Sequence, residues 1–383
     1  MNTQAQAQAQ APVPLNIIML AGGAGLVISL AFALVNLMGS GHASFNTGSS
    51  GVSWGLPVVT YVFFSMASTG LAMVAALAAM FGARQYAPLI KRCTWLSIIT
   101  LVAAFASLAL EMGHPFRMLW AVPLNFQPAS ALVWMGIFYS ICLLLLAIKF
   151  AKMHSGNWRG EGLTKVGFVL EVLALGTLGS AFGLMAMRPA WYGADVPALF
   201  LACGAVIGVA FAVLINQLTY GMDVKAMPER VRNVMTGSLP KLFAVTLGIY
   251  LVFLLFRTVN GLWTNAEGFE VVHMMVKSPW FMIEVIALLG AFFVMINPAM
   301  RAVGNMQVIA AVATLVAMFI GRYEYIIGGQ LVPLFKGAWE TGLIDYTPSM
   351  TEWMITAMAF SLVFAGWAFG EKALNLAAEP AER

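Results

Sequence analysis

The sequence predicts an all-α, polytopic integral membrane protein with ten transmembrane helices. Of its 383 residues, 61% are apolar and only 9% are charged, whereas a soluble domain carries about 25% charged residues. The apolar residues gather in runs of about 20, the length that crosses a bilayer as a helix. This composition excludes a soluble enzyme, a disordered chain and an ordinary nucleic-acid-binding protein.

The expected spans follow from these runs and from the Gly- and Pro-containing breaks between them. In the first half they cover residues 15–38, 57–81, 93–112, 129–150 and 163–187, with breaks at Gly39-Ser40-Gly41, His114-Pro115 and Arg188-Pro189. In the second half they cover 196–220, 240–263, 279–296, 302–321 and 350–369, with breaks at Asn297-Pro298 and Thr347-Pro348. We therefore expect a single membrane domain, 15–373, between tails at 1–14 and 374–383.

The distribution of positive charge predicts the orientation. The N-terminal tract is rich in Gln and Ala and lacks the charged region of a cleavable signal peptide, so the first span is expected to stay as an anchor. Ten spans place fourteen of the 20 Lys and Arg residues on the side of the two termini. The positive-inside rule then places both termini in the cytoplasm of a bacterial-type inner membrane. The outer face carries the long loops, which favour a docking platform for another protein.

The Cys and His residues give no sign of a metal or haem site. The cysteines stand far apart in apolar runs, which excludes a CxxC site, an iron–sulfur cluster and a disulfide framework: Cys93, Cys142 and Cys203. A transmembrane b-type haem needs paired histidines at similar depth. The histidines instead fall in loops or at span ends: His42, His114, His154 and His273. We expect no haem, iron–sulfur cluster or metal in this chain.

A polar group closes the third span. Pro115 disfavours helical geometry at His114, so Glu111 occupies the last turn, where the negative end of the helix dipole disfavours an anion. A carboxylate there needs a cation, and His114 and Arg117 are the nearest in sequence. Such a group suits proton exchange with a bound molecule, although an ordinary interfacial salt bridge explains it equally well.

Other polar residues are expected at the same outer level, where they would line an amphipathic pocket. They are Tyr61, Ser65, Ser130, Trp134, Ser180 and Arg188. Tyr and Trp also occur at membrane interfaces without any ligand.

Deeper in the membrane, Arg257 and Glu284 are expected about 8–9 Å below the outer ends, where they could form a buried ion pair. Glu171 and Glu284 could belong to a proton relay, or they could make structural polar contacts.

Several ordered motifs carry a resemblance to a known family. They are Trp54-Gly55 before Tyr61-Val62-Phe63-Phe64, Glu111-Met112-Gly113-His114-Pro115-Phe116-Arg117, Asn125 and Ser130 before Trp134, Arg322, Gly328-Gly329-Gln330, Tyr346-Thr347-Pro348-Ser349 and Glu352. Over nearly its whole length the chain resembles the ten-helix branch of the NrfD/PsrC family, the membrane subunits of polysulfide reductase. Most relatives have Asp and Leu-Gly-Arg-Pro in the acidic motif, where this chain has Glu111 and His114.

The resemblance implies a cofactor-free, quinone-reactive anchor subunit of a respiratory oxidoreductase complex. Its exchangeable substrate would be menaquinone or ubiquinone, and an iron–sulfur subunit would dock on the outer face. Beyond that partner would lie a molybdenum-pterin catalytic subunit or a cytochrome. The implied fold is two four-helix bundles, helices 2–5 (about 54–190) and helices 6–9 (about 196–321), flanked by helix 1 and by helix 10 (about 350–370).

The residue roles that follow from this hypothesis are specific. Glu111 and His114 would exchange protons with the quinone, Tyr61 or Ser65 would donate to a carbonyl, and Arg117 would hold the charge of Glu111. Two other functions fit the same sequence. Ten helices with intramembrane Glu and Arg also suit an ion-coupled secondary transporter, although the Pro residues fall at span ends rather than at midplane. A structural anchor without a quinone site is the third interpretation.

Overall fold

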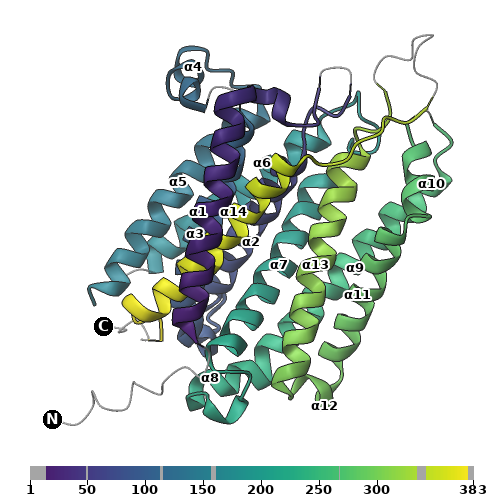
Figure 1. The fold of residues 1–383 in the computed structure, drawn as a ribbon. Helices are drawn as coiled ribbons and strands as arrows, with labels where there is room; N and C mark the ends of the chain where they lie inside the picture. Colours follow the sequence, from purple (N-terminus) through teal and green to yellow (C-terminus); the bar gives the residue numbers. More distant parts are fainter. Residues whose placement is uncertain are drawn as a thin grey trace.

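The protein is built of helices (Figure 1). The computed structural model describes residues 14–48, 51–112, 115–156, 161–266, 268–333 and 342–377. Within these ranges, ten helices are long and apolar enough to cross a membrane. They are α1 (Leu15–Ser40), α2 (Leu56–Phe81), α3 (Ile90–Glu111), α5 (Ala131–His154), α6 (Glu161–Gly183), α7 (Val196–Thr219), α9 (Leu239–Trp263), α11 (Pro279–Ile296), α13 (Gly304–Gly328) and α14 (Met350–Ala373). The predicted all-α, polytopic architecture is confirmed.

Short helices lie at the two ends of the long ones (Figure 1). The upper end carries α4 (Met118–Leu124) and α10 (Glu270–Val276), and the lower end carries α8 (Glu229–Asn233) and α12 (Pro298–Arg301). The chain enters α1 and leaves α14 at the lower end. Local sequence explains several helix starts. Pro occupies the first turn of α2, α9 and α11, where its missing N–H costs nothing, and Ser349 and Glu352 form a capping box on α14.

One helix end differs substantially from the prediction. The ninth span was expected to stop at residue 321, which would place Arg322 in an outer loop. Helix α13 instead continues to Gly328, and Arg322, Glu324 and Tyr325 are all buried in its last turns. The charged residues resemble a loop start in the sequence, yet in the fold they face polar groups of neighbouring helices. The fifth span ends earlier than expected, at Gly183.

The long helices pack in two sets that meet at α2 and α7. In the first set α2 contacts α3 and α6, and α5 contacts the same two helices. In the second set α7 contacts α9 and α13, and α11 also contacts both. Gly70 of α2 lies so close to Gly204 and Gly208 of α7 that a Cβ atom at Gly70 would overlap the α7 backbone. Helices α1 and α14 pack on each other, and α14 also contacts α2 and α3.

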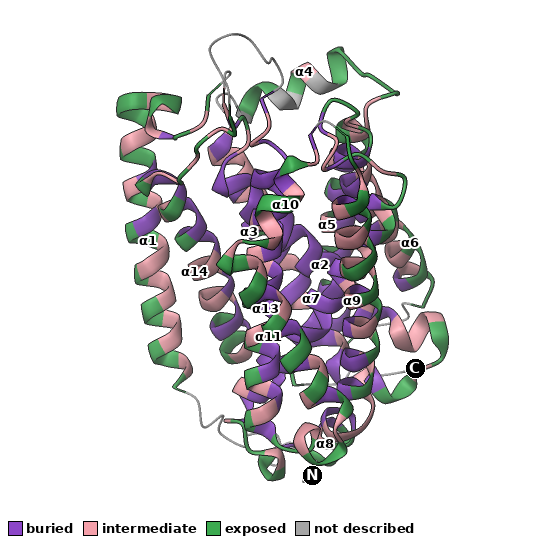
Figure 2. Ribbon diagram, turned by 90° about the vertical axis from the view of Figure 1, so that its right-hand side faces the viewer, coloured by how far each residue is buried: buried purple, intermediate pink, exposed green. Residues whose placement is uncertain are grey.

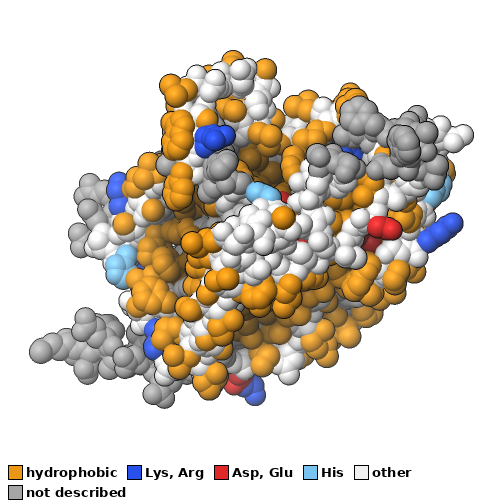
Figure 3. Space-filling view, turned by 45° about the horizontal axis from the view of Figure 1, so that its top comes forward, with side chains coloured by type: hydrophobic (Ala, Val, Ile, Leu, Met, Phe, Trp, Pro, Cys, Tyr) orange, Lys and Arg blue, Asp and Glu red, His pale blue; other side chains and the backbone are white. Residues whose placement is uncertain are grey.

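Burial follows this arrangement (Figure 2). The apolar stretches of α2 and α7 are each 78% buried, whereas that of α1 is only 17% buried. Large apolar side chains such as Leu20, Val35 and Phe256 are more than half exposed. Figure 3 shows hydrophobic side chains over the sides of the molecule and few charged ones among them. Apolar surface of this extent is suited to contact with lipid.

Candidate functional site

The polar site at the upper end begins with Glu111, the last residue of α3. Its side chain is buried, and Oε1 accepts a hydrogen bond from the Gly55 N–H at 3.5 Å. Gly55 is the N-cap of α2, so the carboxyl group faces the positive end of that helix dipole. Oε2 is buried and has no hydrogen-bond partner among the described residues. The site therefore presents one unsatisfied carboxyl oxygen in an apolar setting.

The cations expected beside Glu111 are placed differently. His114 lies outside the described residues. Arg117 is exposed at the end of a short 3₁₀ turn, and within the described ranges it forms no ion pair with Glu111. The N-terminus of α2 therefore supplies the polar contact that the sequence assigned to Arg117. Helix dipoles from distant parts of the chain cannot be anticipated from sequence neighbours.

A row of hydroxyl groups leads downward from Gly55 along one face of α2. Tyr61, Ser65 and Thr69 follow at intervals of four residues, which places them above one another. The Tyr61 hydroxyl donates to the Met135 sulfur at 3.1 Å. The Ser65 hydroxyl is buried and has no partner in the described part of the chain. Tyr139 on α5, which sequence reasoning missed, has a buried hydroxyl of the same kind.

The row ends at Glu171. Thr69 Oγ1 donates to Glu171 Oε2 at 2.8 Å, and the carboxyl group is buried. A cavity of about 20 Å³ adjoins it, lined also by Cys142, Lys149 and Thr164. By the rise of 1.5 Å per residue, Tyr61 and Thr69 are about 12 Å apart along α2. The polar groups thus extend from Glu111 deep into the first set of helices.

Within the described ranges, the hydrogen bonds of the remaining predicted pocket residues go to groups other than Glu111. Ser130 is the N-cap of α5 and Ser180 donates to Gly176 of its own helix at 2.9 Å. Trp134 is 37% exposed and donates to the Pro128 carbonyl.

The segment before α2 is fixed by two residues to which sequence reasoning gave no role in the site. Gln330 Oε1 accepts from the Ser53 and Trp54 N–H groups, both at 2.9 Å, and its Nε2 donates to the Trp54 carbonyl at 2.9 Å. Tyr346 accepts from the Leu56 N–H at 3.0 Å and donates to Glu352 at 2.5 Å. Burial, followed by this bond to Glu352, raises the pKa of Tyr346, so its hydroxyl stays protonated. Gln330 and Tyr346 both belong to the motifs that carry the family resemblance, and this was the sequence signal that could have identified them as site residues.

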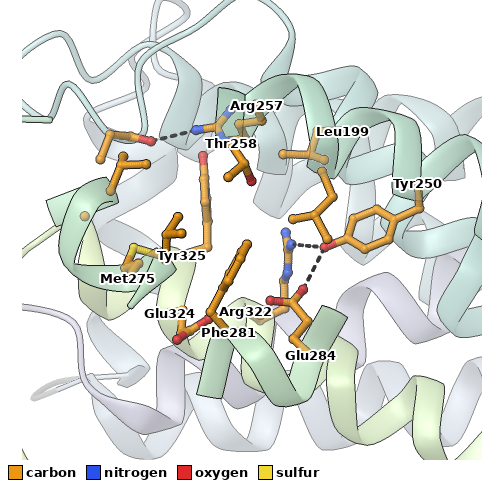
Figure 4. Close-up of a pocket in the computed structure, with 16 residues that line it drawn as sticks. Leu199, Tyr250, Arg257, Thr258, Met275, Phe281, Glu284, Arg322, Glu324 and Tyr325 are labelled. Carbon is orange, nitrogen blue, oxygen red and sulfur yellow. Dashed lines mark hydrogen bonds between the residues drawn. The ribbon is translucent and has the colours of Figure 1, made fainter. Parts of the chain in front are cut away.

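A second polar group lies in the other set of helices (Figure 4). The ion pair expected between Arg257 and Glu284 is not formed. Arg257 binds Asp195 at 3.3 Å and the Ala190 carbonyl at 2.6 Å. Glu284 accepts from Tyr250 at 3.1 Å, and that hydroxyl accepts from Arg322 at 3.2 Å. Arg257 and Glu284 nevertheless line the same cavity.

The family described as polysulphide reductase, NrfD, matches residues 45–334. The Hdr-like menaquinol oxidoreductase integral membrane subunit of Archaeoglobus fulgidus is 24% identical over 377 residues, which cover 92% of this chain and 90% of the relative. A selenate reductase subunit of Mesobacillus selenatarsenatis is 23% identical over 353 residues, which cover 79% of this chain and 80% of that relative.

Proposed function

Because the chain belongs to the NrfD family of membrane subunits, we propose that it exchanges electrons between membrane quinones and an iron–sulfur partner of a respiratory oxidoreductase complex. Its curated relatives are subunits of a menaquinol oxidoreductase and a selenate reductase. The observation that carries the proposal is Glu111, a buried carboxyl group with one unpaired oxygen beside a row of buried hydroxyls. Such a setting suits a molecule that gains or loses protons with its electrons.

In this proposal the quinone head binds below Gly55. Glu111 exchanges protons with the quinone oxygens, with His114 as its partner in this step. Tyr61 or Ser65 donates to a quinone carbonyl, which supplies the buried Ser65 hydroxyl with the partner it lacks among the described residues. Arg117, Ser130, Trp134 and Ser180 form the outer margin of the site. The quinone is menaquinone or ubiquinone.

Protons reach the quinone through the first set of helices. The Tyr61, Ser65 and Thr69 row lies on α2 between Gly55, which contacts Glu111, and Glu171, which Thr69 contacts. Lys149, near the lower end of α5, adjoins the same small cavity as Glu171. A chain of ionisable and hydroxyl groups inside a membrane protein is the usual form of a proton relay. Glu171 is therefore assigned to proton transfer from the lower end.

The remaining architecture follows the family. We take the two packing sets, α2–α3–α5–α6 and α7–α9–α11–α13, as the two four-helix bundles that the resemblance implies, with α1 and α14 as the flanking helices; the helix contacts support this. Both termini lie in the cytoplasm and the membrane is a bacterial-type inner membrane, because the lower end carries most of the cations. The iron–sulfur partner docks on the upper end, with a molybdenum-pterin subunit or a cytochrome beyond it.

Quinol oxidation or quinone reduction by the assembled complex tests the proposal. Glu111→Gln and His114→Ala are each expected to lower turnover by about 100-fold or more, the usual contribution of a general acid–base group. Glu161→Gln is the matched control, since the Glu161 side chain is 78% exposed and distant from the upper end. Full activity in both variants would contradict the proposal.

A further inference from the structure

The second set of helices contains a cavity of about 90 Å³ that the proposed quinone site does not use (Figure 4). Its walls come from α9, α10, α11 and α13, with Leu199 of α7 and Ala190 beside them. Leu254, Val272, Met275 and Phe281 supply apolar surface. Arg322, Glu284 and Glu324 supply polar groups to the same space. The cavity is amphipathic, as small-molecule sites are.

Arg322 is the strongest indication that something occupies this cavity. Arg322 is 3% exposed, and among its guanidinium nitrogens only Nη2 makes a hydrogen bond, which it donates to the Tyr250 hydroxyl at 3.2 Å. Nε and Nη1 are buried and have no partner among the described residues. Buried guanidinium N–H groups are almost always paired in folded proteins. Arg322 is one of the residues that line the cavity, so an acceptor bound there could pair with its guanidinium group.

The charges around Arg322 restrict that acceptor. Arg257 is already bound to Asp195 and to a backbone carbonyl. Glu284 and Glu324 are buried beside the same cavity, and Oε2 of Glu324 has no partner within the described ranges. Two carboxyl groups against one available guanidinium disfavour an anion. The groups instead suit a neutral molecule with a carbonyl oxygen for Arg322 and, when reduced, a hydroxyl for Glu324.

We propose that this cavity binds the head group of a second quinone or quinol, separate from the one at Glu111. The apolar walls take the ring, Arg322 donates to one ring oxygen, and Glu324 accepts from the hydroxyl of the quinol form. Gly321 contributes by its lack of a side chain, because a Cβ atom there would overlap the Glu284 carboxyl group. The chemical class of this molecule rests on the proposed function of the chain.

Binding stoichiometry of a fluorescent quinol analogue, 2-heptyl-4-hydroxyquinoline N-oxide, tests the inference in the purified complex. The unaltered complex is expected to bind two molecules per chain. Arg322→Leu should remove one of them, and Glu111→Gln should weaken the other by at least tenfold. If Arg322→Leu does not assemble, Arg322→Lys takes its place. This variant keeps the positive charge but loses the guanidinium N–H groups, and it should weaken binding at the second site by about tenfold. Arg84→Lys is the control at an exposed arginine.

The outcomes separate the two proposals. A single bound molecule that depends on Glu111 and is unaffected by either Arg322 variant would overturn the second site and leave the proposed function intact. Two bound molecules with both retained at full affinity in the Arg322 variants would also overturn it. If Glu111→Gln changes neither binding nor turnover while Arg322→Leu removes one molecule, the second site stands and the Glu111 site falls.

Discussion

Gln330 is expected to hold the start of α2 in the position that Glu111 requires. Its side-chain amide makes hydrogen bonds to Ser53, Trp54 and the Ile326 carbonyl, while Gly55 follows directly and donates to Glu111. Gln330→Leu keeps a side chain of similar length and removes all of these bonds. The substitution thus tests whether this connection between α13 and α2 supports the site.

The magnitude follows from the groups left unpaired. Ser53 is exposed, so water can replace Gln330 at its N–H, but the N–H and C=O groups of half-buried Trp54 lose their partner. Each buried unsatisfied group costs about 1–3 kcal/mol, so we expect a loss of about 2–4 kcal/mol in the free energy of unfolding. Displacement of Gly55 should also lower quinol turnover by between about 10- and 100-fold.

The assay is thermal unfolding of the purified complex in parallel with quinol turnover. Gln127→Leu provides a matched control, because Gln127 is exposed in the segment before α5. If Gln330→Leu unfolds at the same temperature and turns over as the unaltered complex does, the start of α2 does not depend on Gln330 and the reasoning fails.

Three further predictions rest on single contacts. Arg92→Leu should lower the free energy of unfolding by about 3–5 kcal/mol in thermal unfolding, because Glu371 would keep a buried charge without its partner. A double Arg92→Leu, Glu371→Leu variant that is less stable than Arg92→Leu alone would refute this. Thr69→Val removes the hydrogen bond to Glu171. It should slow proton uptake by the complex in vesicles while quinone binding stays unchanged. Proton uptake at the normal rate would exclude Thr69 from the relay. Gly55→Ala places a Cβ atom against the Glu352 carboxyl group and should reduce quinol turnover. Gly136→Ala is the control, because a Cβ atom at Gly136 meets open space. Equal turnover in the two variants would contradict the close packing at Gly55.

Helix positions could be predicted because a bilayer fixes the length of an apolar run and Pro and Gly mark the ends. The end of α13 could not, because Arg322 and Glu324 resemble a loop until Tyr250 and Glu284 are placed beside them. Charged residues inside a helix are recognisable only from their tertiary partners. For this reason the sequence did not predict that α13 continues from residue 321 to Gly328.

The site shows a similar division. Position along a helix follows from the rise per residue, and Arg257 and Glu284, which were expected at similar depth, line one cavity. Rotation about the helix axis depends on packing, and it turned Arg257 toward Asp195 instead. Glu111 stood out by its chemistry, whereas the partner that it meets, Gly55, belongs to another helix.

Photoaffinity labelling with an azido-quinone, mapped by peptide mass spectrometry in the assembled complex, tests the central claim most directly. The account predicts label on the upper ends of α2 and α3, around Tyr61, Ser65 and Glu111, and its loss when excess unlabelled quinone is present. Label that never reaches these helices, while the complex remains active with quinol, would contradict a quinone site at Glu111.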